Sequence, residues 1–172
     1  MKPQQNKAEH VAEMLNDLVK INTDRVARYQ KGLDMAANLD SDLICVFENI
    51  IADSYKYKNE LKEKMNELGV NPYPVLGISG QLHRAWSDLS VALSTNTRKA
   101  IMASCQYNED IAQHAYTAAL STDFTPFDDI RQLIELQQKA MKQTSERIKK
   151  CNEEYYVINT AMRNFQYSPM ML

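Results

Sequence analysis

Apolar side chains recur every three or four residues along most of this chain, the spacing that places them on one face of an α-helix. The pattern predicts four long amphipathic helices, over about residues 7–37, 41–68, 97–120 and 125–165. Each helix carries a single apolar stripe, so each needs to bury one face against its neighbours. We therefore expect an all-α protein in which the four helices enclose one core.

The ends of these helices carry local signals. Asn6, with Glu9 three residues later, resembles a capping box for the first helix. Gly69 follows the second helix, where a left-handed residue commonly ends one. Thr125 is expected to cap the fourth helix, with Pro126 at its first helical position.

The connection between the second and third helices, residues 69–96, is the longest in the chain. Its first part is rich in glycine and proline, and a short amphipathic helix is expected over about residues 80–93. One face of this short helix is apolar: Leu82, Trp86, Leu89 and Leu93. A connection of this length can cross the whole bundle, so that the helices it joins run parallel. The expected architecture is therefore a ferritin-like four-helix bundle with a long crossover that carries an extra short helix and packs through this face.

The apolar stripe of the fourth helix continues past the length that a bundle needs. Its last members alternate in steps of three and four: Tyr155, Ile158, Met162 and Phe165. We expect a bundle domain over residues 1–152 and a C-terminal extension over residues 153–172. An extension that projects into solvent would expose an apolar contact site and favour a homodimer or higher oligomer. In the alternative, the extension folds back over the end of the bundle.

Composition narrows the class of protein. The chain has 172 residues, with 20 basic and 22 acidic side chains and a net charge of -2, so no basic excess is available to bind nucleic acid. The longest apolar run is too short to span a membrane, and the polar start does not resemble a signal peptide. Three widely spaced cysteines are typical of buried thiols in a reducing compartment. These observations predict a cytoplasmic protein with neither a nucleic-acid nor a membrane partner.

The middle of the bundle is where a ferritin-like protein would hold a pair of metal ions. Such a site uses Glu-x-x-His pairs, and the sequence contains none. The inward positions at this level are instead neutral and polar: Asn22, Ser54, Asn108 and Gln137. We expect these side chains to form a hydrogen-bonded layer that fixes the register of the helices. No catalytic, cofactor-binding or metal-binding residue is predicted.

Three segments also resemble a bacterial family of ferritin-like four-helix-bundle proteins classed as a domain of unknown function. They are Leu15–Tyr29, Ser79–Leu93 and Asn108–Tyr116, and the Leu-His-Arg-Ala-Trp stretch within the second is the most distinctive. The resemblance covers roughly residues 10–150. It implies the ferritin-like fold and brings no established activity with it.

The sequence therefore favours a non-enzymatic scaffold or self-associating interaction protein. One alternative is a metal-binding or redox protein whose atypical site uses Glu48, Glu60 or Glu109. Another is a protein that holds an apolar ligand near Trp86.

Overall fold

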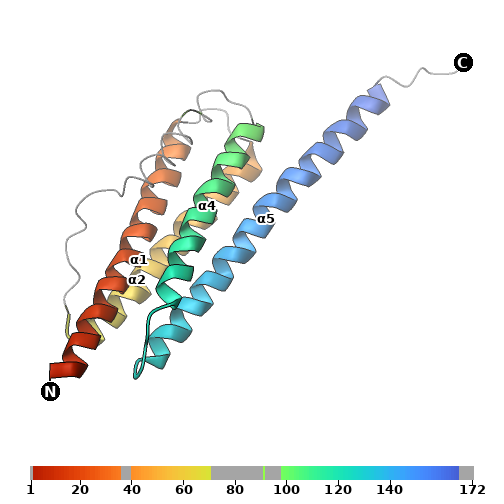
Figure 1. Ribbon diagram of the computed structural model, residues 1–172. Helices are drawn as coiled ribbons and strands as arrows, with labels where there is room; N and C mark the ends of the chain where they lie inside the picture. Colours follow the sequence, from red (N-terminus) through yellow and green to blue (C-terminus); the bar gives the residue numbers. More distant parts are fainter. Residues whose placement is uncertain (1, 36–39, 71–90, 92–97, 167–172) are drawn as a thin grey trace, which may run out of the picture.

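The computed structural model describes residues 2–35, 40–70, 91 and 98–166, and these residues form long α-helices without a strand among them (Figure 1). The helices are α1 (Lys2–Met35), α2 (Ser41–Glu67), α4 (Arg98–Leu120) and α5 (Asp128–Gln166). The prediction of an all-α chain with four long helices is confirmed. The predicted crossover face, Leu82, Trp86, Leu89 and Leu93, lies outside the described residues.

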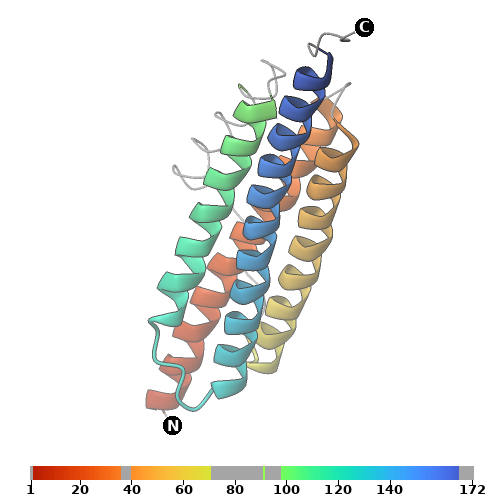
Figure 2. The ribbon, with the colours of Figure 1, turned by 90° about the vertical axis from the view of Figure 1, so that its right-hand side faces the viewer.

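Contacts between the helices give their directions. Arg98, the first residue of α4, forms ion pairs with Asp40 and Asp42 at the start of α2, so α2 and α4 run parallel. Lys64, near the end of α2, lies 2.9 Å from Asp129 at the start of α5, so α5 runs antiparallel to α2. The two views in Figures 1 and 2 show the same arrangement, with α1 and α5 running opposite to α2 and α4. The end of α2 and the start of α4 therefore lie at opposite ends of the bundle.

The C-terminus of α2 ends as predicted. The N–H of Val70 donates to the carbonyl of Met65 at 3.1 Å, and the N–H of Gly69 donates to the carbonyl of Asn66 at 2.9 Å. These two bonds form a Schellman motif, which satisfies carbonyls that have no partner inside the helix. The motif needs a left-handed residue at Gly69, whose φ of 73° is accessible to glycine without strain.

Two predicted N-termini are wrong. The first helix already begins at Lys2, so Asn6 lies inside α1 and does not cap it. The fourth helix begins at Asp128, after a cis peptide bond between Thr125 and Pro126. The N–H of Thr125 donates to the carboxylate of Asp123 in the preceding turn, so Thr125 belongs to that turn and not to the helix start.

The buried core consists of two apolar clusters at different levels of the bundle. The cluster nearer the N-terminus of α1 includes Val11, Leu15, Leu61, Tyr116, Ile130 and Ile134. The cluster nearer the N-terminus of α2 includes Tyr29, Leu43, Phe47, Ile101, Cys105 and Ile148. All four helices contribute to both clusters, which are formed by the apolar stripes that the sequence predicts. The polar side chains between these clusters form the candidate site.

Candidate functional site

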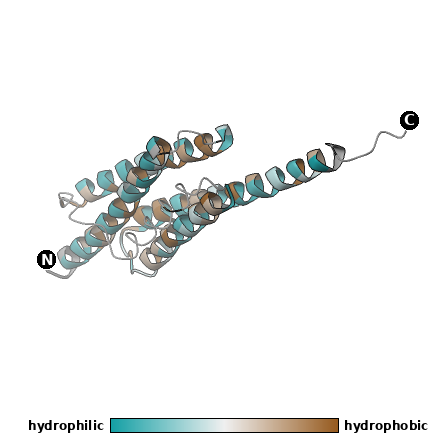
Figure 3. Ribbon diagram, turned by 90° about the horizontal axis from the view of Figure 1, so that it is seen from above, coloured by the Kyte–Doolittle hydropathy of each residue, from teal (hydrophilic) through white to brown (hydrophobic). Residues whose placement is uncertain are grey.

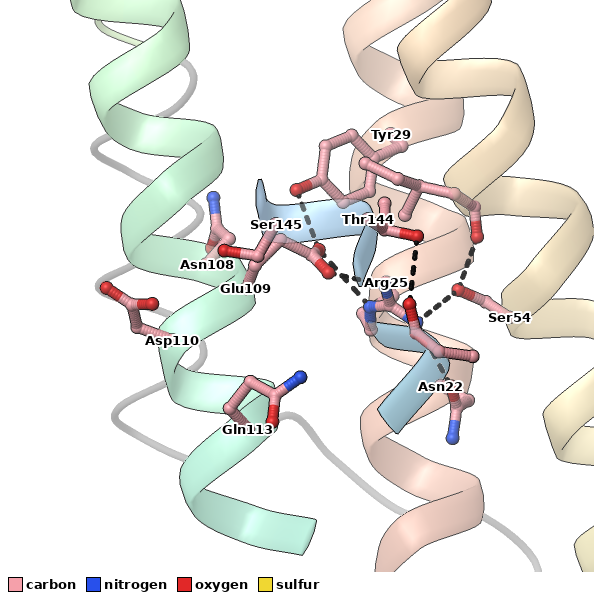
Figure 4. Close-up of polar contacts among 12 residues, drawn as sticks. Asn22, Arg25, Tyr29, Ser54, Asn108, Glu109, Asp110, Gln113, Thr144 and Ser145 are labelled. Carbon is pink, nitrogen blue, oxygen red and sulfur yellow. Dashed lines mark hydrogen bonds and ion pairs between the residues drawn. The ribbon is translucent and has the colours of Figure 1, made fainter. Parts of the chain in front are cut away.

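A layer of buried polar side chains separates the two apolar clusters. We call it the polar layer, and its members are Asn22, Arg25, Ser54, Asn108, Glu109, Tyr116 and Gln137. The four residues predicted for this level are all buried, each no more than 2% exposed. Figure 4 shows side chains from α1, α2 and α4 pointing toward one another across the middle of the bundle. The four predicted residues do not include the charged pair in the middle of the layer.

That pair is Arg25 of α1 and Glu109 of α4, whose side chains are 2% and 0% exposed. Arg25 Nη2 donates to Glu109 Oε2 at 2.6 Å, and Arg25 Nε donates to Glu109 Oε1 at 3.3 Å. The hydroxyl of Tyr29 donates to Glu109 Oε1 at 3.0 Å. The fork-like contact pairs two groups that would each be very costly to bury alone, because a buried charge without a partner loses its hydration.

Arg25 also reaches the neutral members of the layer. Its Nη1 donates to the hydroxyl of Ser54 at 3.0 Å and lies 3.4 Å from the amide oxygen of Asn22. The Ser54 hydroxyl in turn donates to the carbonyl of Ile50 at 2.6 Å. One guanidinium therefore connects α1, α2 and α4 (Figure 4).

The phenol of Tyr116 continues the network to the remaining helix. Asn22 Nδ2 donates to the Tyr116 hydroxyl, which donates to Gln137 Oε1, both at 2.8 Å. Gln137 Nε2 then donates to Glu60 Oε2 at 2.9 Å. This chain of bonds passes from α1 through α4 and α5 to α2, so all four helices are joined at one level.

A second buried guanidinium lies beside the layer on α1. Arg28 Nη1 donates to Asn108 Oδ1 at 2.7 Å, and Arg28 Nε donates to the carbonyl of Asp24 at 3.2 Å. Burial lowers the pKa of Arg28. Burial also raises the pKa of Asp24, and the nearby Arg28 opposes that rise. The predicted layer of neutral residues implied a neutral partner for Asn108. Its partner is instead the positively charged guanidinium of Arg28.

Burial fixes the protonation states of the titratable groups around the pair. It raises the pKa values of Tyr29, Tyr116 and the Cys105 thiol above their ordinary values. For Arg25, burial acts to lower the pKa, but attraction and hydrogen bonding from Glu109 outweigh it and the net pKa is raised. The phenols and the thiol therefore stay neutral near pH 7, and the guanidinium stays charged. Such groups can hold the helices together but are poor acids, bases or nucleophiles.

The carboxylates considered for an atypical metal site lie apart or are already bound. Glu48 is exposed on α2, Glu60 accepts from Gln137, and Glu109 is paired with Arg25. His114 Nδ1 donates to the main-chain carbonyl of Asp110 at 2.8 Å. Within the described ranges, no three His, Cys, Asp or Glu side chains are grouped so that they could hold a metal ion.

The signal that would have found the charged pair is periodicity. Asn22, Arg25 and Tyr29 follow one another in steps of three and four, so Arg25 lies on the inner stripe of α1. Glu109 directly follows Asn108, on a helix whose buried stripe is broad. An arginine on an inner stripe requires a buried acid within reach, and this requirement predicts Glu109.

The far end of α5 is the second candidate site. Arg98 stacks on the ring of Tyr155, with its Cζ 4.0 Å from the ring centroid, and Tyr155 is half-buried there. Tyr155 therefore contacts the bundle, and α5 continues for eleven more residues to Gln166. We call residues 156–166 the α5 overhang. It adds about 16 Å of helix, and Figures 1 and 2 show it extending past the starts of α2 and α4. Seen from above in Figure 3, the helix that leads to the C-terminus reaches beyond the other helices.

The α5 overhang exposes an apolar surface. Val157, Ile158 and Met162 are 69%, 54% and 62% exposed. Of the four residues predicted for an oligomer contact, Ile158 and Met162 lie on this surface, Tyr155 contacts Arg98, and Phe165 is described in its backbone only.

The three cysteines differ in burial, although all three were expected to be buried. Cys105 is buried as predicted, whereas Cys45 is exposed and Cys151 is half-buried.

Comparison with known proteins places the chain in a family. Residues 10–122 match the family described as a domain of unknown function (DUF2383). The chain belongs to this family. The match includes α2, α4 and most of α1, and it ends before α5 begins. No curated protein matches the chain.

A helix that crosses a bilayer must be both long and apolar. Across the described ranges, none is both long enough and apolar enough to cross a membrane. The charged residues of α5 illustrate this, since Arg147, Lys149, Lys150, Glu153 and Glu154 fall within eight positions of one another.

Proposed function

We propose that this protein is a cytoplasmic, ferritin-like helical-bundle protein that acts by self-association and not by catalysis. The observation that carries the proposal is the exposed apolar surface at Val157, Ile158 and Met162 of the α5 overhang. Exposed apolar side chains that lie close together on a helix mark contact sites, because leaving them in water is unfavourable. The proposed domain division is a bundle over residues 1–152 and a contact-forming extension over residues 153–172.

The directions of the helices support the ferritin-like part of the proposal. Parallel α2 and α4, each with an antiparallel partner next to it in the chain, match that topology and differ from an up-down-up-down bundle. The polar layer lies at the level where related folds hold metal ions. Here Arg25 supplies the positive charge that a metal ion would supply, and both oxygens of Glu109 accept hydrogen bonds. The arrangement therefore favours a structural layer over the metal-binding alternative.

The proposal is tested by the mass of the full-length protein in solution across a range of concentrations. We expect sedimentation velocity to show a reversible oligomer, and Ile158→Lys/Met162→Lys to abolish it, because buried lysine charges oppose association. Point variants are preferred to truncation after residue 152, because truncation would also remove Tyr155 and its contact with Arg98.

The matched control is Leu136→Lys. Leu136 is 67% exposed on the same helix but lies at the level of the bundle, away from the α5 overhang. We expect this variant to associate like the unchanged protein. A protein that stays monomeric at the highest concentrations, or an oligomer that survives Ile158→Lys/Met162→Lys, would contradict the proposal.

A further inference from the structure

We infer that the α5 overhang pairs with the overhang of a second copy of this chain in an antiparallel, two-fold arrangement, with the two bundles at opposite ends. The inference rests on the proposed self-association and specifies its geometry. It follows from three features of α5: the face that carries the apolar stripe, the spacing of that stripe, and the absence of charge along it.

The face of α5 decides the direction. Ile134, Met141 and Ile148 are buried against the other helices, and Tyr155 and Met162 continue the same seven-residue spacing. The exposed stripe is therefore the continuation of the face that packs on the bundle. In a parallel pair, the α5 of the second copy would lie along this face at the level of Ile148, where α1, α2 and α4 already lie. Packed helices are about 8–10 Å apart, so a parallel partner would overlap the bundle.

An antiparallel partner avoids this overlap. Its overhang occupies the free face beyond Tyr155, and its bundle lies past the C-terminal end of the first overhang. The two-fold axis makes both copies use the same surface, so the pair closes and leaves no second apolar surface for further addition.

The spacing of the stripe fixes the register. With the axis near Thr160, Ile158 lies opposite Met162 of the second copy, and Tyr155 lies opposite Phe165 of the second copy. Shifting by one heptad in one direction brings Phe165 of the second copy against Ile148, inside the bundle. A shift of one heptad in the other direction pairs Ile158 with position 169 of the second copy, which is a proline and not part of the apolar stripe. Only the first register pairs the two overhangs along their whole length.

The charges of this segment favour a second copy as the occupant. Every residue from Tyr155 to Met162 is uncharged, so two copies meet without repulsion between like charges. Arg163 is the only charged residue of the α5 overhang, so the overhang offers little to a strongly acidic or basic partner. Two eleven-residue helices bury less than the roughly 1,600 Å² of a standard interface, so we expect a dimer that dissociates readily.

Disulfide trapping tests the direction and the register together. In a Cys45→Ser/Cys151→Ala background, Ile158→Cys and Met162→Cys chains are prepared separately, one with a purification tag, and oxidised alone or mixed. Antiparallel pairing places residue 158 opposite residue 162 of the second copy, within disulfide reach, and keeps two copies of residue 158 too far apart. We expect at least about tenfold more disulfide-linked dimer in the mixture than in either chain alone.

The outcomes separate the inference from the proposed function. Efficient linkage of Ile158→Cys chains to one another, with sedimentation showing a dimer, would indicate parallel pairing and overturn the inference while the proposed self-association stands. A dimer in sedimentation with no linkage in any combination would overturn the register in the same way. A protein that is monomeric by sedimentation and forms no linked dimer would overturn both.

Scattering gives an independent readout that needs no cysteine. Each α5 is about 58 Å long, and two that overlap by eleven residues span about 100 Å. We expect the maximum dimension of the dimer in small-angle X-ray scattering to be near that value. A compact dimer no longer than one α5 would contradict the end-to-end arrangement.

Discussion

In most proteins charged side chains are exposed and apolar side chains are buried. The polar layer and the α5 overhang both show the reverse. Arg25 and Glu109 are charged and almost completely buried, whereas Ile158 and Met162 are apolar and mostly exposed. In the layer, each charge has a partner on another helix of the same chain. The overhang extends beyond the helices that would cover it within the described part of the chain. The difference shows that the charges of the first region find their partners within the fold, whereas the apolar side chains of the second stay exposed, as the proposed self-association requires.

The largest effect is expected from breaking the charged pair. Arg25→Met leaves Glu109 buried without its cation, and we expect a loss of about 3–5 kcal/mol in the free energy of unfolding. Urea denaturation measures this loss. The double variant Arg25→Met/Glu109→Gln removes the buried charge and is expected to be more stable than Arg25→Met alone.

The control for this prediction is Arg131→Met, which removes the exposed pair that Arg131 forms with Glu135 on α5. Exposed pairs of this kind contribute about 0–1 kcal/mol. If Arg25→Met were as mild as Arg131→Met, the polar layer would not depend on its charges, and the contrast between the two regions would be lost.

A smaller effect is expected from the neutral part of the layer. Tyr116→Phe removes the hydroxyl that bridges Asn22 and Gln137, and both amides then stay buried with one partner fewer. We expect a loss of about 1–3 kcal/mol in unfolding free energy by urea denaturation. Tyr107→Phe, at a half-exposed position on the same helix, should change it by less than about 0.5 kcal/mol. Equal effects at the two positions would show that the bridge contributes no stability.

Arg98 pairs with Asp42 and stacks on Tyr155, at the end of the bundle where the α5 overhang begins. This contact predicts that the free energy of unfolding depends on pH. Hydrogen bonding from Arg98 lowers the pKa of Asp42 from its ordinary value of 3.8, with burial opposing. A carboxyl whose folded pKa is lower than its unfolded pKa stabilises the protein above the unfolded value, and this contribution is lost as the pH falls through the folded value. Because Asp42 is partly exposed, solvent screening keeps the contribution below about 1 kcal/mol.

We therefore expect unfolding free energy to fall more steeply below about pH 4 in the unchanged protein than in Asp42→Asn. Thermal or urea denaturation between pH 6 and pH 2.5 measures the two slopes. Glu135→Gln, which changes an exposed carboxyl away from this contact, is the control. Parallel curves for Asp42→Asn and the unchanged protein would show that Arg98 does not hold this end of the bundle through Asp42.

The smallest effect on folding is expected at the α5 overhang. At concentrations where the protein is monomeric, Ile158→Lys should change the unfolding free energy by no more than about 0.5 kcal/mol, because the side chain is already exposed. The same substitution is expected to abolish the oligomer at high concentration. A large loss of stability in the monomer would show instead that the overhang packs on its own bundle, the alternative in which the extension folds back.

The positions of the four long helices and the level of the polar layer could be predicted from the sequence. Hydrophobic periodicity found all four helices in the described ranges, and the same periodicity placed Asn22 and Gln137 at inward positions. It failed at the starts of α1 and α5 but not at those of α2 and α4. At α5 the reason is that Thr125 bonds to Asp123 in the preceding turn, a contact that hydrophobic periodicity does not encode. Periodicity also passed over Arg25, and Glu109 was named only as a candidate metal ligand and not as the partner of Arg25. A charged residue on an inner stripe is recognised only when its partner on another helix is considered at the same time.

The extent of the overhang was predictable from the unbroken stripe of α5, but its exposure was not. Exposure depends on where the other helices end, and Arg98 stacking on Tyr155 marks that point in three dimensions. Function was less accessible still, because membership in a domain family of unknown function adds no chemistry to the residues.

One uninterrupted helix carries Gln137 in the polar layer and Ile158 in the α5 overhang. The two residues are separated by about six helical turns without an internal proline, so α5 behaves as a stiff rod between them. A rotation of its free end about the helix axis would also turn Gln137 relative to Tyr116 and strain that bond. The hydrogen bond between Tyr116 and Gln137 therefore opposes rotation of α5 about its axis, and with it a change in the direction that its apolar end faces.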